Sequence, residues 1–279
     1  MTNYRIQRVL VTIGIVFLTA IFLALILGPF YWVLLSSFRY TKDILARDIQ
    51  LIPTYIIWDN WVDLFRETKF TTYLKNTVII SALTLVFTLV LSVTAAYGFW
   101  RFEFPGKSLL RRMILVVYLF PLVILLIPLY KFMAVLNLID TPWSLILVYV
   151  AFSAPFCVWL LESFFQGIPK EVDEAATMEG ASRMQVLFRI FIPLIAPGLV
   201  SVATFTIVFA WSEYMFAVVF LNKETAMTLP IGVALFMSVV RQEWGLVGAG
   251  ATGVVLPVML LFGIAGQRFI RNTTEGIVK

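Results

Sequence analysis

A polar segment, residues 166–193, lies between two long apolar stretches and carries side chains suited to contacting a partner. Pro169 suits the first turn of a helix. The acidic side chains at 171, 173 and 174 place negative charge near the N-terminus of that helix, where the helix dipole is positive. Gly180 can end it, because glycine adopts a left-handed cap without steric cost. Ser182 and Gln185 form a capping-box pattern that opens a second helix. The segment therefore predicts a helix–Gly–helix knob for non-covalent docking.

Covalent and metal chemistry have little support elsewhere in the chain. The sequence contains no histidine, the commonest metal ligand and general base, and its one cysteine, Cys157, lies in an apolar stretch. The run Pro105-Gly106-Lys107-Ser108 is similar to the end of a phosphate-binding loop, but Arg101 occupies the position of the required first glycine. We expect no bound metal or cofactor in this chain and no nucleotide site, so any ATP and Mg²⁺ would belong to a partner.

The composition indicates an all-α integral membrane protein. Hydrophobic residues make up 61% of the chain and charged residues 13%, and the mean hydropathy is +0.95. About 20 apolar residues are needed to cross a bilayer as a helix. Stretches of this kind cover residues 9–35, 77–99, 113–135, 143–165, 194–221 and 246–269. We therefore predict six transmembrane helices, with residues 166–193 connecting the fourth and the fifth.

The distribution of basic residues favours cytoplasmic N- and C-termini. With that orientation, twelve of the 21 lysines and arginines lie on the cytoplasmic side. Six of the other nine fall in the long first external loop, where charge counts less in this rule. The polar segment is then cytoplasmic. The net charge of +5 reflects this topology and anionic lipid, and we expect no nucleic-acid partner.

The spacing within the polar segment resembles the EAA loop of ABC-importer permeases. Glu174-Ala175-Ala176 is followed after three residues by Gly180, and after nine more by Ile190-Phe191-Ile192-Pro193. One position departs from the family pattern, because Ile192 stands where leucine is usual, a substitution that should leave packing nearly intact. The resemblance implies that Glu174, Ala175, Ala176, Gly180, Ile190 and Pro193 couple the membrane helices to an ATPase.

Further runs resemble the shorter permease subunit of maltose-type sugar importers over about residues 70–279. They include Ala95-Ala96-Tyr97 to Lys107, Ile127 to Tyr130, and Trp211-Ser212-Glu213-Tyr214, where serine replaces the usual asparagine. The resemblance implies a sugar importer of the bacterial or archaeal cell membrane. Its expected partners are a homologous second permease, two cytoplasmic ATPase subunits and an external solute-binding protein.

Glu213 is the acidic residue of most interest within a predicted helix. A carboxylate in hydrocarbon is costly and tends to face a bundle interior or a water-filled cavity. Trp211, Glu213 and Tyr214 are therefore candidates for a solute pathway. A hydrogen bond between helices, or a helix that ends before Glu213, would explain the same residue structurally. Both interpretations stay open at this stage.

We divide the chain into residues 1–70, the first transmembrane helix with its external loop, and residues 71–279, a permease core with the coupling loop and a cytoplasmic C-terminal tail. The predicted function is a non-catalytic permease subunit that moves a mono- or oligosaccharide by alternating access. An ion-coupled secondary transporter and an importer of a polyol or glycerol phosphate are the alternatives. A secondary transporter often shows internal repeats and charged sites near mid-membrane.

Overall fold

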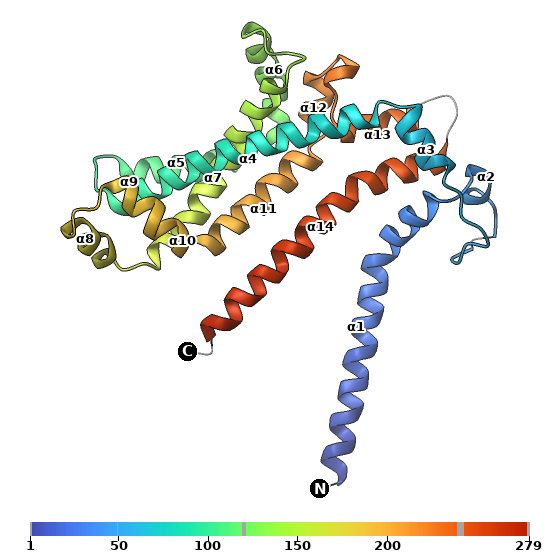
Figure 1. The fold of residues 1–279 in the computed structure, drawn as a ribbon, viewed down its shortest axis with the longest axis horizontal. Coiled ribbons are helices and arrows are strands. Elements are labelled where there is room, and N and C mark those ends of the chain that lie inside the picture. The colour runs from blue at the N-terminus through green and yellow to red at the C-terminus, as the bar shows by residue number, and fades with distance from the viewer. Residues whose placement is uncertain (1, 49, 119–120, 239–242, 278–279) are drawn as a thin grey trace. The chain divides into compact units, whose positions relative to one another are not determined.

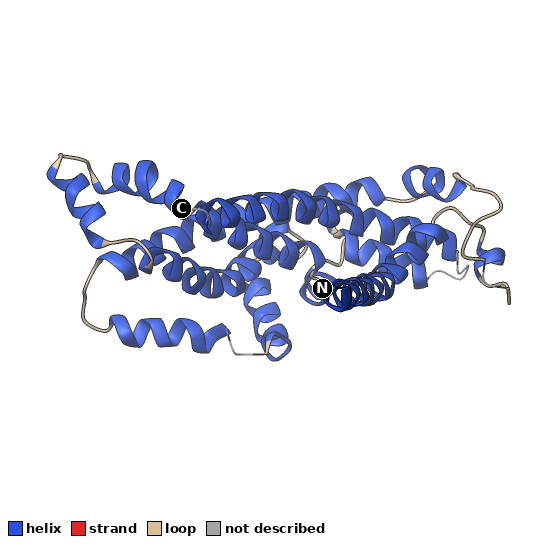
Figure 2. Ribbon diagram, turned by 90° about the horizontal axis from the view of Figure 1, so that it is seen from below, coloured by secondary structure: helices blue, strands red, loops and turns tan. Residues whose placement is uncertain are grey.

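The computed structural model describes residues 2–48, 50–118, 121–238 and 243–277. Within these residues all regular structure is helical, as the composition predicts (Figure 2). The chain forms two compact units, which are described separately below. The first contains Met1–Phe70 and Val233–Val255, and the second contains Thr71–Gly232 and Leu256–Lys279.

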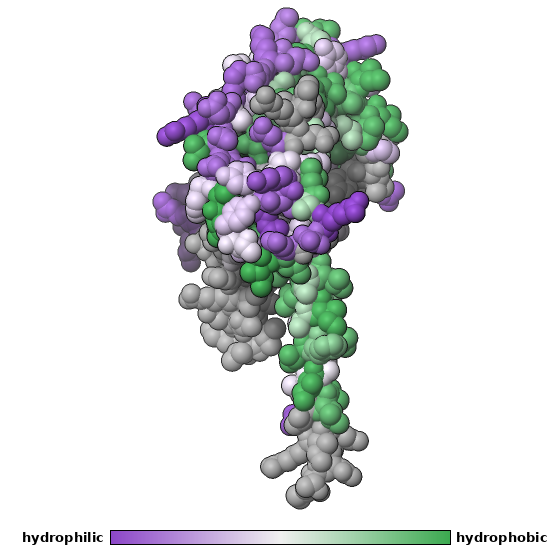
Figure 3. All heavy atoms as spheres, turned by 90° about the vertical axis from the view of Figure 1, so that its right-hand side faces the viewer, coloured by the Kyte–Doolittle hydropathy of each residue, from purple (hydrophilic) through white to green (hydrophobic). Residues whose placement is uncertain are grey.

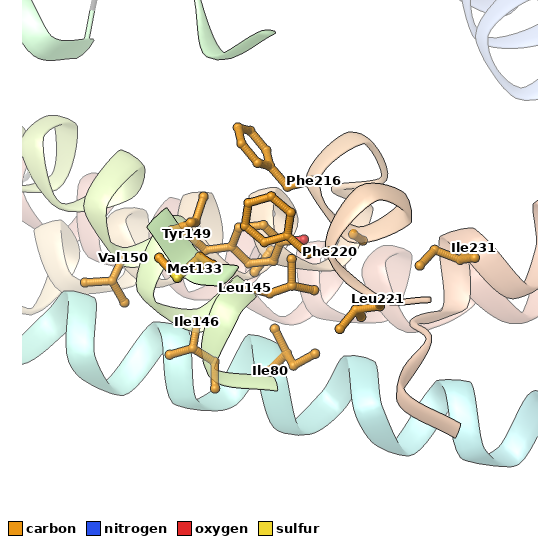
Figure 4. Packing of buried hydrophobic residues seen from close by; sticks show 13 residues of the cluster. Ile80, Met133, Leu145, Ile146, Tyr149, Val150, Phe216, Phe220, Leu221 and Ile231 are labelled. Atoms are coloured by element: carbon orange, nitrogen blue, oxygen red, sulfur yellow. The ribbon is translucent and has the colours of Figure 1, made fainter. Parts of the chain in front are cut away.

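Long apolar helices form the framework of the second unit. α4 (Phe70–Arg101) is the first helix of this unit. α7 (Pro142–Gln166) and α11 (Ala196–Ser212) lie side by side, and α5 (Lys107–Tyr118) packs on α7 (Figure 1). Around Tyr149 a core cluster brings residues of α7 together with Phe216 and Phe220 (Figure 4). A second cluster contains Trp100, Phe165 and other aromatic residues. The first cluster holds α12 on the helices, and the second supports the polar segment.

The predicted stretches 113–135 and 194–221 are not single helices. The first is divided among α5, the short turn Leu122–Leu125 that begins after Pro121, and α6 (Leu126–Val135). The second is divided among α10 (Ile192–Leu194), α11 and α12 (Met215–Phe220). Prolines without an N–H donor account for the breaks near Pro121 and Pro197. Residues 119–120 of the predicted third helix lie outside the described residues.

Four described helices are long and apolar enough to cross a membrane. They are Leu10–Ser36, Phe70–Arg101, Pro142–Gln166 and Trp244–Leu261. A fifth results if the helical run Arg183–Leu194 and α11, which meet at an angle of 80°, are counted as one broken span. The chain is thus a multi-pass membrane protein on length and composition.

The first unit contains α1 (Thr2–Ser36), the short helices α2 (Thr41–Ile44) and α3 (Asp59–Arg66), and the start of α14 (Trp244–Ile277). The surface of α1 is hydrophobic along most of its described length, as expected of a helix facing lipid (Figure 3). α13 (Leu229–Ser238) belongs to both units, as do α4 and α14. Residues 278–279 of the predicted tail lie outside the described residues.

The glycines at the start of α14 allow close backbone packing, as their small size suggests. A Cβ atom at Gly245 would lie 2.5 Å from the carbonyl oxygen of Arg39, and one at Gly248 would lie 2.9 Å from the backbone nitrogen of Ser37. The Asn60 amide donates to the Ser37 and Arg39 carbonyls at 3.0 and 2.9 Å. The segment after α1 therefore lies close to the start of α14 and is hydrogen-bonded to α3.

Candidate functional site

The polar segment forms the predicted helix–Gly–helix knob. α8 (Lys170–Met178) begins directly after Pro169, which lies one position before the first turn. Gly180 has φ +85°, and the N–H groups of Gly180 and Ala181 donate to the carbonyls of Thr177 and Ala176 at 3.0 and 3.1 Å. These two bonds define a Schellman cap, which satisfies the last carbonyls of the helix.

The second helix of the knob, α9 (Arg183–Val186), opens with a complete capping box. The Ser182 N–H donates to Gln185 Oε1 at 2.8 Å, and the Gln185 N–H donates to Ser182 Oγ at 3.4 Å. The chain continues through the π-helical turn Leu187–Phe191 into α10. Figure 1 shows α8 and α9 at one end of the second unit and α12 toward the other.

Pro193 lies one residue before the end of the helical run that begins at Arg183. The helical run continues to Leu194 and breaks at Ile195, where the chain turns into α11. Proline has no N–H group to donate to the carbonyl one turn back, which disturbs a regular helix. The π-helical turn Leu187–Phe191 ends two residues before Pro193. Ile190 packs against the aromatic cluster, whereas Pro193 is exposed. Their coupling roles stay predictions.

Asp173 is the residue that fixes α8 to the membrane helices. Its side chain is fully buried, and it accepts a hydrogen bond from the Tyr97 hydroxyl at 3.0 Å. It also forms ion pairs with Arg101, at the end of α4, and with Arg183 at 2.8 Å. A buried carboxylate is tolerated only when it is paired and hydrogen-bonded. The cluster therefore links both helices of the knob to α4.

Apolar packing completes the inner face of the knob. Ala176 of α8 and Val186, Leu187 and Phe191 after it are buried in one cluster with Trp100, Tyr97 and Phe165. The Phe191 and Trp100 rings meet edge to face with centroids 5.1 Å apart. A larger side chain than Ala176 would push α8 away from these rings. The small side chain of Ala176 thus allows close packing within the chain itself.

The outer face of the knob is exposed and partly apolar. Glu174, Ala175 and Gly180 are exposed, as a surface for a partner requires. Met178 is 89% exposed, and Met184 in α9 and Phe188 in the π-helical turn after it are 59% and 57% exposed. Methionine suits adaptable binding surfaces because its side chain is flexible and polarisable. One face of the knob is thus fixed internally, and the other is free to contact a partner.

Glu213 lies at the break between α11 and α12, not inside a continuous helix. Its backbone is extended, with φ −69° and ψ 125°. One carboxylate oxygen accepts the Phe216 N–H at 2.9 Å, and the other accepts the Ala217 N–H at 3.2 Å and the Tyr149 hydroxyl at 2.6 Å. The carboxylate therefore satisfies the first N–H groups of α12 and ties that helix to α7. The structural alternative left open by the sequence accounts for these contacts.

The other two candidates for the solute pathway differ in exposure. The Trp211 side chain is buried at 5% exposure, whereas Tyr214 is 44% exposed at the break. The pathway role of Trp211, Glu213 and Tyr214 stays a prediction.

Replacing Glu213 with alanine is expected to lower Tm by several degrees, because loss of a helix cap costs about 0.5–2 kcal/mol. Tyr149→Phe removes only the phenol hydrogen bond, at a cost of about 0.5–1.5 kcal/mol, and should lower Tm less. Thermal unfolding of the detergent-solubilised chain measures both. Unchanged Tm with lost solute transport in Glu213→Ala would instead favour the solute-pathway role.

Sequence reasoning missed Asp173, Arg101 and Glu162 as paired residues. Asp173 had been interpreted as a charge at a helix terminus, and Arg101 only as the residue in place of the first glycine of a phosphate-binding loop. The Glu162 carboxylate, at the end of α7, is buried and pairs with Arg111 of α5. One signal was available, because Asp173 shares its helix face with Ala176, three residues later. A charge on the small-residue face of an amphipathic helix indicates a buried partner.

The geometry defines a class of protein, a multi-pass membrane protein with an internally anchored, outwardly exposed helix–Gly–helix knob. Residues 88–274 match the family model described as "Binding-protein-dependent transport system inner membrane component". The chain is 33% identical over 276 residues, 98% of both chains, to the "Inner membrane ABC transporter permease protein YcjP" of Escherichia coli (strain K12).

Two further comparisons agree. The chain is 34% identical over 278 residues, 98% of both chains, to the "Trehalose/maltose transport system permease protein MalG" of Thermococcus litoralis. It shares the fold of a solved chain from a bacterial ABC transporter involved in alginate import, with TM-score 0.80 and 23% identity over 95% of this chain and 98% of that one. This protein belongs to the family of binding-protein-dependent transport system inner membrane components. It is a non-catalytic permease subunit of an ABC importer in the cell membrane.

Proposed function

We propose that this permease imports a mono- or oligosaccharide. The observation that carries the coupling part of the proposal is the two-sided construction of residues 166–193, with an inner face fixed at Asp173 and an exposed outer face around Glu174. The name of the Thermococcus litoralis relative, which specifies trehalose and maltose, supports a sugar as the solute. Uptake of labelled maltose or trehalose into vesicles, with glycerol 3-phosphate as the comparison, tests the solute class.

The proposed topology has six transmembrane helices and cytoplasmic termini. Four described helices meet the length and hydropathy requirement, and the bent pair ending in α11 supports a fifth. The sixth would be the broken stretch of α5 and α6, in which Leu122–Val135 is also apolar. Residues 1–70 then carry the first helix with its external loop, and residues 71–279 carry the permease core.

The complex would contain a homologous second permease, two cytoplasmic ATPase subunits that bind ATP and Mg²⁺, and an external solute-binding protein. α8 would insert into a cleft of one ATPase subunit, with Glu174 making charge contacts and Ala175 allowing close approach. Closure of the ATPase dimer would move the knob as a rigid body. The Asp173 cluster would pass this movement to α4, and so alternate access to the solute pathway.

Glu174→Ala is expected to lower the hydrolysis of ATP stimulated by the solute-binding protein by roughly tenfold or more, because truncating one partner of an interfacial charge pair costs about 2–5 kcal/mol. The measurement uses the complete complex in lipid. Glu179→Ala is the matched control, since it removes an exposed carboxylate from the end of the same helix.

The possible outcomes distinguish three interpretations of the protein. Lost stimulation in an assembled complex supports coupling through Glu174. Loss of the ATPase subunits from the complex would make the knob a docking element only. If the native chain co-purifies with no ATPase, the ion-coupled secondary transporter becomes the better interpretation.

A further inference from the structure

A cavity of about 590 Å³ lies beside the base of the coupling knob. Its volume is within the usual range for small-molecule sites. The end of α4, the turn before α5, the end of α7 and the segment leading into α8 all contribute to its walls. The lining residues that carry the argument are Gly106, Lys107, Ser108, Arg111, Glu162 and Lys170.

Three basic side chains line this cavity, and their charges are incompletely matched. Lys107 is only 13% exposed, and it pairs at 2.7 Å with Glu103, which is 77% exposed. A pair with so exposed a partner is weak and easily replaced. Lys170 has no ion pair or hydrogen bond with the described residues.

One hydrogen-bond donor of Arg111 is unpaired among the described residues. Its terminal nitrogen pairs with Glu162, but its Nε–H is buried and has no acceptor among the described residues. A buried donor without a partner carries a desolvation penalty that an added acceptor would remove. The cavity thus offers charge and hydrogen-bond donors that the chain's own acceptors do not use.

The N-terminus of α5 borders the same cavity. Gly106, with φ +83°, turns the chain into this 12-residue helix, and Lys107 and Ser108 form its first turn. The first N–H groups of a helix lack partners within it and attract anions. This is the Gly-Lys-Ser run that the sequence excludes as a nucleotide-binding loop. Its chemistry nevertheless suits a single phosphate group.

We propose that this cavity binds a phosphate-bearing anion, and that binding biases the position of the coupling knob. Ile168, which precedes α8, and Lys170, the first residue of α8, are part of the cavity wall, so an occupant contacts the base of the knob directly. α4 and α7 are candidate membrane spans that end at the cavity. A lipid phosphate headgroup and a soluble phosphate both meet the site's requirements. The inference rests on the proposed function for the cytoplasmic location of the cavity.

The test uses the full complex in phosphatidylcholine nanodiscs, and it has two arms. One adds phosphatidylglycerol to the lipid, and the other adds inorganic phosphate against chloride at equal ionic strength. The native complex is expected to change its binding-protein-stimulated ATPase rate roughly fivefold or more in one arm, a typical allosteric coupling. The double substitution Lys107→Gln and Lys170→Gln should abolish this response.

Arg112→Gln is the matched control, because Arg112 is exposed on α5 and does not line the cavity. It should retain the native response. If the double variant does not assemble, Lys170→Gln alone replaces it, since Lys170 is exposed and unpaired in the described structure. If the ligand is a lipid, native mass spectrometry should show less bound phosphatidylglycerol for either lysine variant than for Arg112→Gln. If the ligand is soluble, either lysine variant should need more phosphate than Arg112→Gln for the same change in ATPase rate.

A response to phosphatidylglycerol assigns the site to a lipid headgroup, and a response to phosphate assigns it to a soluble ligand. An active native complex that responds in neither arm overturns the proposal, as does an equal loss of response in Arg112→Gln. A chain that co-purifies with no ATPase contradicts the proposed function instead. In that case, phosphatidylglycerol binding that is equal for the native and lysine-variant chains overturns the cavity proposal separately.

Discussion

Asp173→Ala is expected to abolish most of the ATP hydrolysis stimulated by the solute-binding protein while leaving the chain in the membrane. Asp173 is fully buried, and its removal leaves Arg101, whose side chain is only 22% exposed, without its charge partner. Breaking a buried ion pair by removing one partner costs about 3–5 kcal/mol. The Tyr97 hydroxyl also loses its acceptor. The knob would then lose its polar contacts with α4 and keep only apolar packing there, so it would transmit movement poorly.

Two measurements check this prediction in the complete complex. The stimulated ATPase rate should fall by at least about tenfold, and limited proteolysis should cut residues 166–193 faster than in the native chain. Glu171→Ala is the matched control, because Glu171 carries the same charge in the same helical turn but is exposed. Equal behaviour of the two variants would contradict the anchoring role of Asp173.

A double-mutant cycle separates the ion pair from other effects of the substitution. Removing both partners of a buried pair is often far less harmful than removing one. The double variant with Arg101→Ala and Asp173→Ala should therefore lose less free energy of unfolding than the two single variants lose in sum. The difference should be about 1 kcal/mol or more. Additive effects would show that Asp173 acts independently of Arg101.

The sequence predicted the features of the knob that depend on local signals. The left-handed cap at Gly180 and the capping box of Ser182 and Gln185 involve residues within a few positions of each other, and the structure confirms both. The burial of Asp173 was not predicted, because its partner Arg101 lies on another helix and only the fold brings them together. Long-range ion pairs leave little trace in a single sequence.

The helix breaks were predictable only in part. Pro121 and Pro197 mark two of them, as the missing N–H of proline implies. The break at Glu213 has no proline or glycine beside it, since Ser212 precedes it and Tyr214 follows it. Its cause is the carboxylate itself, which caps α12 and accepts the Tyr149 hydroxyl. Sequence analysis singled out the charge of Glu213 in the predicted span but not its capacity to cap a helix.

Gly180→Val is expected to reduce coupling strongly, whereas Gly180→Asn should retain most of it. At φ +85° a non-glycine residue costs about 1–2 kcal/mol, and a β-branched residue is the least suited. Asparagine tolerates this conformation and is found at the same cap position in other helices. The cost corresponds to roughly a 5–30-fold loss of the correctly formed knob. The stimulated ATPase rate of both variants, assembled with their partners, measures the difference.

The comparison of these variants separates backbone conformation from surface contact. A Cβ atom at position 180 would meet no atom within 4 Å, so valine and asparagine both project into open space and add similar bulk. If backbone strain decides the effect, only valine uncouples the complex, because the Schellman bonds from residues 180 and 181 are lost. If an ATPase surface can approach only when position 180 carries no side chain, both variants lose coupling equally, and Gly180→Trp loses it as well. Equal failure would therefore move the role of Gly180 from helix capping to the docking surface itself.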